Sequence, residues 1–165
     1  MAPNVSADGS VALLVVARRH IRAEYSAGLL AALNIPFNFD LAATEEVQKL
    51  ALHHNPHAVC LVPEKREERT TEGGLDVLRD EKNLRAFIKP LNEAGCRVSL
   101  LIAAVPAQVD AAKRVGAAVV ELHTGAYCDS FYETKHAQCD AEWANLHSMC
   151  GNEQSIGWEV RGGRD

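Results

Sequence analysis

A regular alternation of short apolar runs with longer segments of helical periodicity constrains the fold of this chain more than any other feature of its sequence. The runs are almost continuously apolar, which is typical of strands covered on both faces in a parallel sheet. They span residues 11–17, 36–42, 58–62, 97–103, 117–123 and, more weakly, 156–160. Strict alternation predicts parallel strands joined by right-handed crossovers. A doubly wound sheet and a (β/α)8 barrel both have this pattern, and the pattern alone does not choose between them.

The segments between these runs carry the start and stop signals of helices. We expect helices over residues 22–33, 44–54, 76–94 and 106–116, and a less regular one over 133–149. Thr44 is an expected N-cap followed by two acidic residues, which suit the positive end of a helix. Pro106 occupies the favoured first position of its helix and Gly116 ends it. Pro90 is expected to kink or break the helix that contains it.

Length and composition limit the classes of protein that the chain can belong to. With 165 residues there is room for one domain, which we expect over residues 11–165 after a flexible tail over 1–10. A net charge of −5 argues against nucleic acid as a partner. The longest apolar run, residues 11–17, is far shorter than the about 20 residues of a membrane-spanning helix and has no signal-peptide character. Five widely spaced cysteines indicate reduced thiols and a cytoplasmic location.

The segment over residues 63–76 is the first candidate for a binding site. It is long and highly charged, and it follows a predicted strand, where functional groups gather in both architectures. Thr70 and Thr71, with Gly73 and Gly74, supply hydroxyl and backbone N–H donors for a phosphate or a sugar hydroxyl. The alternative is an ordinary solvated surface loop.

Carboxylates within two of the predicted strands are candidates for acid–base chemistry. Period-two alternation places Glu121 and His123 on the same side of their strand. A carboxylate buried there should have a raised pKa and serve as an acid or a base. Asp40 repeats this logic on an earlier strand. The alternative for Glu121 is a core carboxylate that is satisfied by one basic partner. The alternative for Asp40 is a cap for the helix that begins near Thr44.

Two clusters of basic or metal-binding residue types are weaker candidates. The triplet 18–20, Arg-Arg-His, suits an anionic ligand or a solvated turn. A repeated His-x-x-Cys pattern is formed by His136, Cys139, His147 and Cys150. If these residues lie on one helix, the two pairs are about 16 Å apart along its axis. One zinc ion does not span that distance, so no metal site is expected.

Three blocks of the sequence, residues 56–66, 70–77 and 120–125, closely resemble the pyridoxine 5′-phosphate synthase family of the deoxyxylulose-dependent vitamin B6 pathway. The resemblance runs from about residue 18 to about residue 127. It implies a (β/α)8 (TIM-type) barrel that is usually assembled into homo-octamers. It also implies condensation of 3-amino-2-oxopropyl phosphate with 1-deoxy-D-xylulose 5-phosphate to pyridoxine 5′-phosphate, phosphate and water, without a metal or organic cofactor.

The resemblance assigns roles to four residues. Thr70 matches a substrate-binding threonine, and His20 matches a histidine that binds the deoxyxylulose phosphate. Glu121 matches a strand carboxylate thought to stabilise the transition state. Asp40 stands where the family has a catalytic glutamate, so the charge is kept on a side chain one methylene shorter.

The chain also departs from the family pattern, which leaves a second interpretation open. Residues 13–17 are Leu-Leu-Val-Val-Ala where the family has His-Leu-Arg-Glu-Asp, and Arg164 stands in place of a catalytic histidine. The six expected strands match family strands two to seven, so we expect a partial barrel, an incomplete domain over residues 11–165. The alternative to an active synthase is a non-catalytic fragment or oligomer-forming subunit of the same ancestry. A third interpretation is a different phosphate-binding α/β enzyme that reuses the loop at Thr70.

Overall fold

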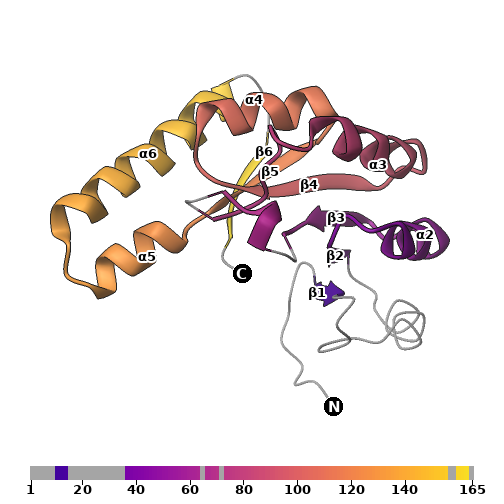
Figure 1. Ribbon diagram of the computed structural model, residues 1–165, viewed down its shortest axis with the longest axis horizontal. Helices are drawn as coiled ribbons and strands as arrows, with labels where there is room; N and C mark the ends of the chain where they lie inside the picture. The colour runs from indigo at the N-terminus through magenta and orange to yellow at the C-terminus, as the bar shows by residue number, and fades with distance from the viewer. Residues whose placement is uncertain (1–9, 15–35, 64–65, 71–72, 156–158, 164–165) are drawn as a thin grey trace, which may run out of the picture.

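A computed structural model of the chain describes residues 10–14, 36–63, 66–70, 73–155 and 159–163 (Figure 1). Most of the expected tail over residues 1–10, the expected helix over 22–33 and the basic triplet at 18–20 lie outside the described residues. Side chains of the first strand are likewise not described, so its residues are placed by backbone register alone.

One six-stranded parallel sheet forms the centre of the described chain. Its strands are β1 (Ser10–Leu14), β2 (Phe37–Leu41), β3 (Ala58–Leu61), β4 (Arg97–Ile102), β5 (Val119–His123) and β6 (Glu159–Gly163). The spatial order of the strands is the same as their order in the chain, and every neighbouring pair is parallel. A doubly wound sheet reverses its strand order at a switch point. This sheet has no reversal, so its order is that of a barrel. Among the described strands β1 and β6 do not pair with each other, so the sheet is not closed, as expected for a partial barrel.

Helices connect the strands in the alternating order that the sequence predicts. They are α2 (Glu45–His54), α3 (Glu81–Glu93), α4 (Pro106–Val115), α5 (Gly125–Tyr132) and α6 (His136–Ser155), with a short 3-10 turn, η1 (Arg66–Glu68). The predicted bounds of α2 and α4 are confirmed within one residue. Thr44 caps α2 by accepting a hydrogen bond from the Val47 N–H at 3.4 Å.

Helix α3 differs from the prediction in its start and in the effect of its proline. It begins at Glu81 rather than at residue 76, because the segment before it turns so that the N–H groups of Val77 and Leu78 donate to the Gln108 side chain of α4. Pro90 does not end the helix, so the expected break is wrong. Pro90 lies in the last turn, where its missing N–H removes one bond, and its carbonyl still accepts the Ala94 N–H at 3.0 Å.

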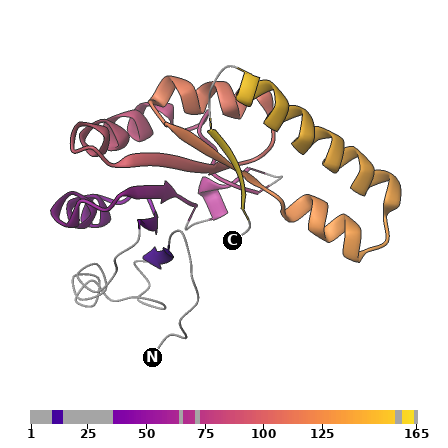
Figure 2. The same ribbon diagram turned by 180° about the vertical axis from the view of Figure 1, so that it is seen from behind.

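The expected helix over 133–149 corresponds to α6, which begins at His136 and continues to Ser155, and it is preceded by a helix that the sequence did not predict, α5. The two helices are separated by a turn in which Thr134 adopts a φ of 55°, a left-handed conformation that ends a helix. Figures 1 and 2 show the two helices lying side by side and extending away from the sheet. Across the described residues, none of the helices combines the length and apolar character needed to cross a bilayer.

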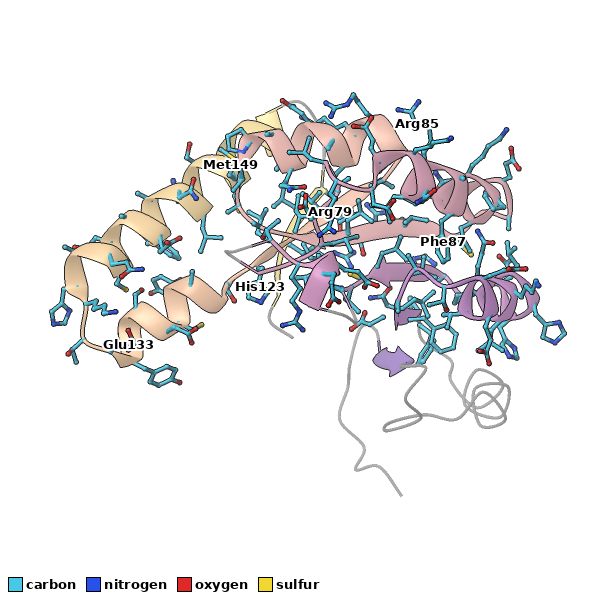
Figure 3. The ribbon with its side chains drawn as sticks, viewed as in Figure 1. Arg79, Arg85, Phe87, His123, Glu133 and Met149 are labelled. Atoms are coloured by element: carbon cyan, nitrogen blue, oxygen red, sulfur yellow. The ribbon has the colours of Figure 1, made fainter. Side chains whose placement is uncertain are left out.

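The hydrophobic core lies on one face of the sheet, which we call the outer face. Alternate residues of four strands point into it, among them Phe39, Leu61, Leu100 and Leu122, each with at most 1% of its surface exposed. Helices α2, α3 and α4 supply the other side of this core, and Phe87 of α3 is one of the side chains packed there (Figure 3). The opposite, inner face is therefore available for a site.

Candidate active site

A row of polar side chains crosses the inner face of the sheet. Asp40 of β2 pairs in register with Cys60 of β3, which pairs with Ser99 of β4. Glu121 of β5 lies opposite Leu101, two positions beyond Ser99. Paired residues of parallel strands point to the same face and successive residues alternate, so these side chains share the face opposite the hydrophobic core. The structure thus brings together the two carboxylates that the sequence singled out, Asp40 and Glu121.

Asp40 is an inner-face carboxylate with strongly altered acidity. Burial raises the pKa of its carboxyl to about 7, and the negative charge of Glu121 adds to the rise. The Asn38 amide, two residues earlier on the same strand, donates to Asp40 Oδ1 at 3.3 Å. Asp40 thus has the raised pKa that is expected for a carboxylate on the inner face. At neutral pH its carboxyl therefore exists in both protonation states.

Ser99 and Cys60 lie between the two carboxylates. The Ser99 hydroxyl is 3.4 Å from Glu121 Oε1 and 3.3 Å from the Val59 carbonyl oxygen. Burial, and then the charge of Glu121, raises the pKa of the Cys60 thiol well above its usual range, so this cysteine stays protonated. Sequence reasoning missed both residues. Cys60 is found only as the cross-strand partner of Asp40, and Ser99 only as the partner of Cys60, so both require the register of the sheet.

The described residues give no support to the two alternatives considered for the carboxylates. Arg161 of β6 is paired with Glu121 in the register, but its guanidinium binds Glu159, with Nε 2.7 Å from Oε1. Among the described residues no basic side chain forms an ion pair with Glu121. Thr44 is itself the cap of α2, so Asp40 is not needed as a cap.

Thr70 lies in a tight turn at the carboxyl end of the sheet. The chain leaves β3, passes through η1 and returns over β4, where the Leu75 N–H donates to the Leu101 carbonyl at 2.7 Å. Gly74 has a φ of 78°, and a Cβ there would fall 2.7 Å from the Ile102 carbonyl carbon, so only glycine fits. Thr71 and Glu72 lie outside the described residues, as does His20, the fourth predicted site residue.

The repeated His-x-x-Cys pattern lies entirely on α6, which runs unbroken from His136 to Ser155. Its two pairs therefore stay about 16 Å apart along the helix axis. In the parts of the chain that the structure describes, no group of three or more histidine, cysteine, aspartate or glutamate side chains is arranged to hold a metal ion.

The strand order and the inner-face carboxylates define a barrel-type α/β protein with two carboxylates, Asp40 and Glu121, on the inner face of its sheet. The family described as "Pyridoxal phosphate biosynthesis protein PdxJ" matches residues 1–165, and the chain belongs to that family. It is 55% identical to the pyridoxine 5′-phosphate synthase of Roseobacter denitrificans and 56% identical to that of Ruegeria pomeroyi, in each case over 163 residues and 99% of this chain. The resemblance drawn from the sequence is thereby confirmed. The chain spans 66% of the length of these curated relatives, just under two thirds.

Proposed function

We propose that this protein acts as a pyridoxine 5′-phosphate synthase, condensing 3-amino-2-oxopropyl phosphate with 1-deoxy-D-xylulose 5-phosphate and releasing phosphate and water. The family assignment and the names of the relatives support the reaction. The observation that carries the proposal is the presence of two carboxylates on the inner face, where Asp40 has a pKa of about 7 that the charge of Glu121 helps to raise.

The reaction needs groups that give and take protons at neutral pH. Imine formation, dehydration, loss of phosphate and ring closure each move a proton, and a group whose pKa is near the working pH transfers protons best. Asp40 fits the role of this acid–base group. Glu121, on the same inner face, fits the role of a carboxylate that stabilises the positive charge developing on an imine nitrogen.

Phosphate recognition completes the proposed site. We assign substrate binding to Thr70, which lies at the carboxyl end of the sheet beside β4, and to His20, whose role follows from the family resemblance. The substrates are therefore small phosphorylated molecules, and no cofactor enters the proposal.

The first test is turnover of both substrates by the purified chain and three variants. Asp40→Asn keeps the shape and removes the acid–base group, so we expect turnover to fall by about 10² to 10⁴-fold. Asp40→Glu restores the family side-chain length and should equal or exceed the parent rate. Asp110→Asn, an exposed carboxylate on α4, is the matched control and should change nothing.

The alternative of a non-catalytic protein makes a different prediction for the same samples. It predicts no pyridoxine 5′-phosphate from the parent chain, while 1-deoxy-D-xylulose 5-phosphate still raises the melting temperature through binding. Leu13 pairs with Asp40 in the register of β1 and β2, at the position where the family has a catalytic histidine. If the site is otherwise intact, Leu13→His should raise the rate.

We also propose that the protein forms a homo-oligomer through the α5–α6 pair. Phe131, Tyr132 and Trp143 are 63%, 77% and 57% exposed on these two helices, and clustered exposed aromatics mark interaction surfaces. The family's octamers support the same inference.

Light scattering should find an assembly in the parent chain and a smaller species after Phe131→Ser and Tyr132→Ser together. Leu78→Ser, an exposed apolar residue outside this pair of helices, is the control. A monomeric parent chain contradicts the proposal.

A cytoplasmic location completes the proposal. All five cysteines, at positions 60, 96, 128, 139 and 150, are free thiols, as expected in a reducing compartment. Alkylation of freshly lysed, denatured cells should label all five, and a disulfide between any two of them contradicts this location.

A further inference from the structure

The imidazole of His123 lies between two backbone segments at the carboxyl end of β5 (Figure 3). On one side it meets Gly73, where a Cβ would fall 2.6 Å from His123 Cε1. On the other side it meets Gly125, where a Cβ would fall even closer to the same atom. Both neighbours must therefore be glycine for the ring to occupy this place.

A hydrogen bond fixes the orientation of the ring. The Gly125 N–H donates to His123 Nδ1 at 3.3 Å. Because Nδ1 accepts this bond, the proton of the neutral imidazole is on Nε2. Gly125 is the first residue of α5, whose initial N–H groups have no partners within the helix, and the Thr124 side chain does not cap it. His123 thus supplies the partner that a capping side chain would supply.

The contact with Gly73 connects this ring to Thr70. The Thr70 hydroxyl donates to the Gly73 carbonyl at 2.6 Å, and the Gly73 N–H donates to the Thr70 carbonyl at 3.2 Å. The Thr70 N–H donates to the Gly74 carbonyl at 3.1 Å. Displacement of Gly73 therefore displaces Thr70, and the imidazole determines how far Gly73 can move toward β5.

We propose that His123 is a positioning residue whose imidazole holds Gly73 against the start of α5 and so fixes Thr70, which is bonded to Gly73, for a phosphorylated substrate. The substrate in this statement rests on the proposed function, whereas the contact between the ring and the turn does not. His123 shares the inner face with Glu121 two residues earlier. The competing role is direct proton transfer by the imidazole, and the two roles differ in measurable ways.

Thermal unfolding of glycine variants tests the contact itself. Gly73 and Gly95 have the same φ of 88°, but Gly95 has nothing within 4 Å of the Cβ position. Gly95→Ala therefore measures the backbone strain alone, and Gly73→Ala measures the strain plus the collision with His123. We expect Gly73→Ala to lower the melting temperature more than Gly95→Ala. In a His123→Ala background the two should become equal. Equal effects in the parent chain, or a difference that persists without the imidazole, overturn the proposal.

Substrate affinity and turnover distinguish positioning from proton transfer. His123→Ala should weaken binding of 1-deoxy-D-xylulose 5-phosphate about five- to tenfold, as expected for loss of one ordering contact, with KM raised and kcat little changed. His123→Asn places an amide oxygen near the position of Nδ1 and should restore most of the affinity. A kcat that falls in both variants while KM stays constant identifies His123 as a proton-transfer group and overturns the positioning role.

A spectroscopic readout separates this inference from the proposed function. Nitrogen NMR of the full chain should find His123 Nδ1 unprotonated and Nε2 protonated in the neutral ring. If the parent chain binds no deoxyxylulose phosphate, the proposed function fails. The tautomer of His123 and the melting temperatures of the glycine variants still test whether the ring contacts Gly73 and Gly125. A proton on Nδ1 contradicts the hydrogen bond from Gly125 and overturns the inference.

Discussion

The two faces of the sheet differ in chemistry although they are built from alternate residues of the same strands. Phe39 and Leu41 point into the outer core, while Asp40 between them lies on the inner face. The same alternation puts Leu100 outside and Ser99 inside on β4. The outer face buries apolar surface and stabilises the fold, whereas the inner face carries groups whose burial costs free energy. Stability and chemistry are therefore assigned to opposite faces of one layer.

The largest loss of stability is expected from a substitution on the outer face. Leu100→Ala removes a side chain with no exposed surface, so it should lower the free energy of unfolding by about 2–5 kcal/mol. Ser99→Ala, the adjacent inner-face position, should cost about 1 kcal/mol, the usual contribution of one hydrogen bond. Urea denaturation measures both. If Leu100→Ala and Ser99→Ala lower the free energy of unfolding equally, the outer face does not contribute more to stability than the inner face.

The inner face should contribute a pH dependence that the outer face lacks. Because the pKa of Asp40 is about 7 in the folded chain and 3.8 is its ordinary value, the folded state holds a proton between these values that the unfolded state has lost. The free energy of unfolding should therefore fall as pH rises from 4 to 7, by about 3 kcal/mol from this group. Asp40→Asn should remove that part of the slope in denaturation curves taken across this range. An unchanged slope contradicts the assignment.

The smallest loss of stability is expected at Thr44, which tests whether the outer layer affects the site on the inner face. Thr44 follows Asp40 by four residues but serves α2, a helix of the outer layer, as its N-cap. Thr44→Ala should lower the free energy of unfolding by about 1 kcal/mol and leave the affinity for deoxyxylulose phosphate unchanged. Thr44→Ser keeps the hydroxyl and should be close to neutral. Loss of affinity in the alanine variant would mean that the outer layer also controls the site.

The elements that the sequence predicted best have local causes. Strands β2 to β5 follow from apolar runs, whereas β6 begins three residues later than the run over 156–160 predicted. Helices α2 and α4 follow from a threonine cap and from the Pro106 and Gly116 signals. The shared side of Glu121 and His123 follows from the two-residue period, and the register confirms it. In each case the information lies within a few neighbouring residues.

The features that the sequence did not predict depend on tertiary contacts. The late start of α3 reflects the Gln108 side chain of a later helix. The division between α5 and α6 occurs at Thr134, a residue with no turn signal of its own. Ser99 joins the site only because β4 lies beside β3 and β5. The contact between His123 and Gly73 likewise requires two segments about 50 residues apart to meet.

Direct titration of the Asp40 carboxyl tests the central claim that the inner face carries the acid–base site. The carboxyl carbon can be followed by NMR in the full chain and in the Glu121→Gln variant, which removes the neighbouring charge and keeps the shape. The account predicts a midpoint of about 7 in the parent chain, falling in the variant but staying above the ordinary value because burial is the larger cause. A midpoint near 3.8 in the parent chain would contradict the claim.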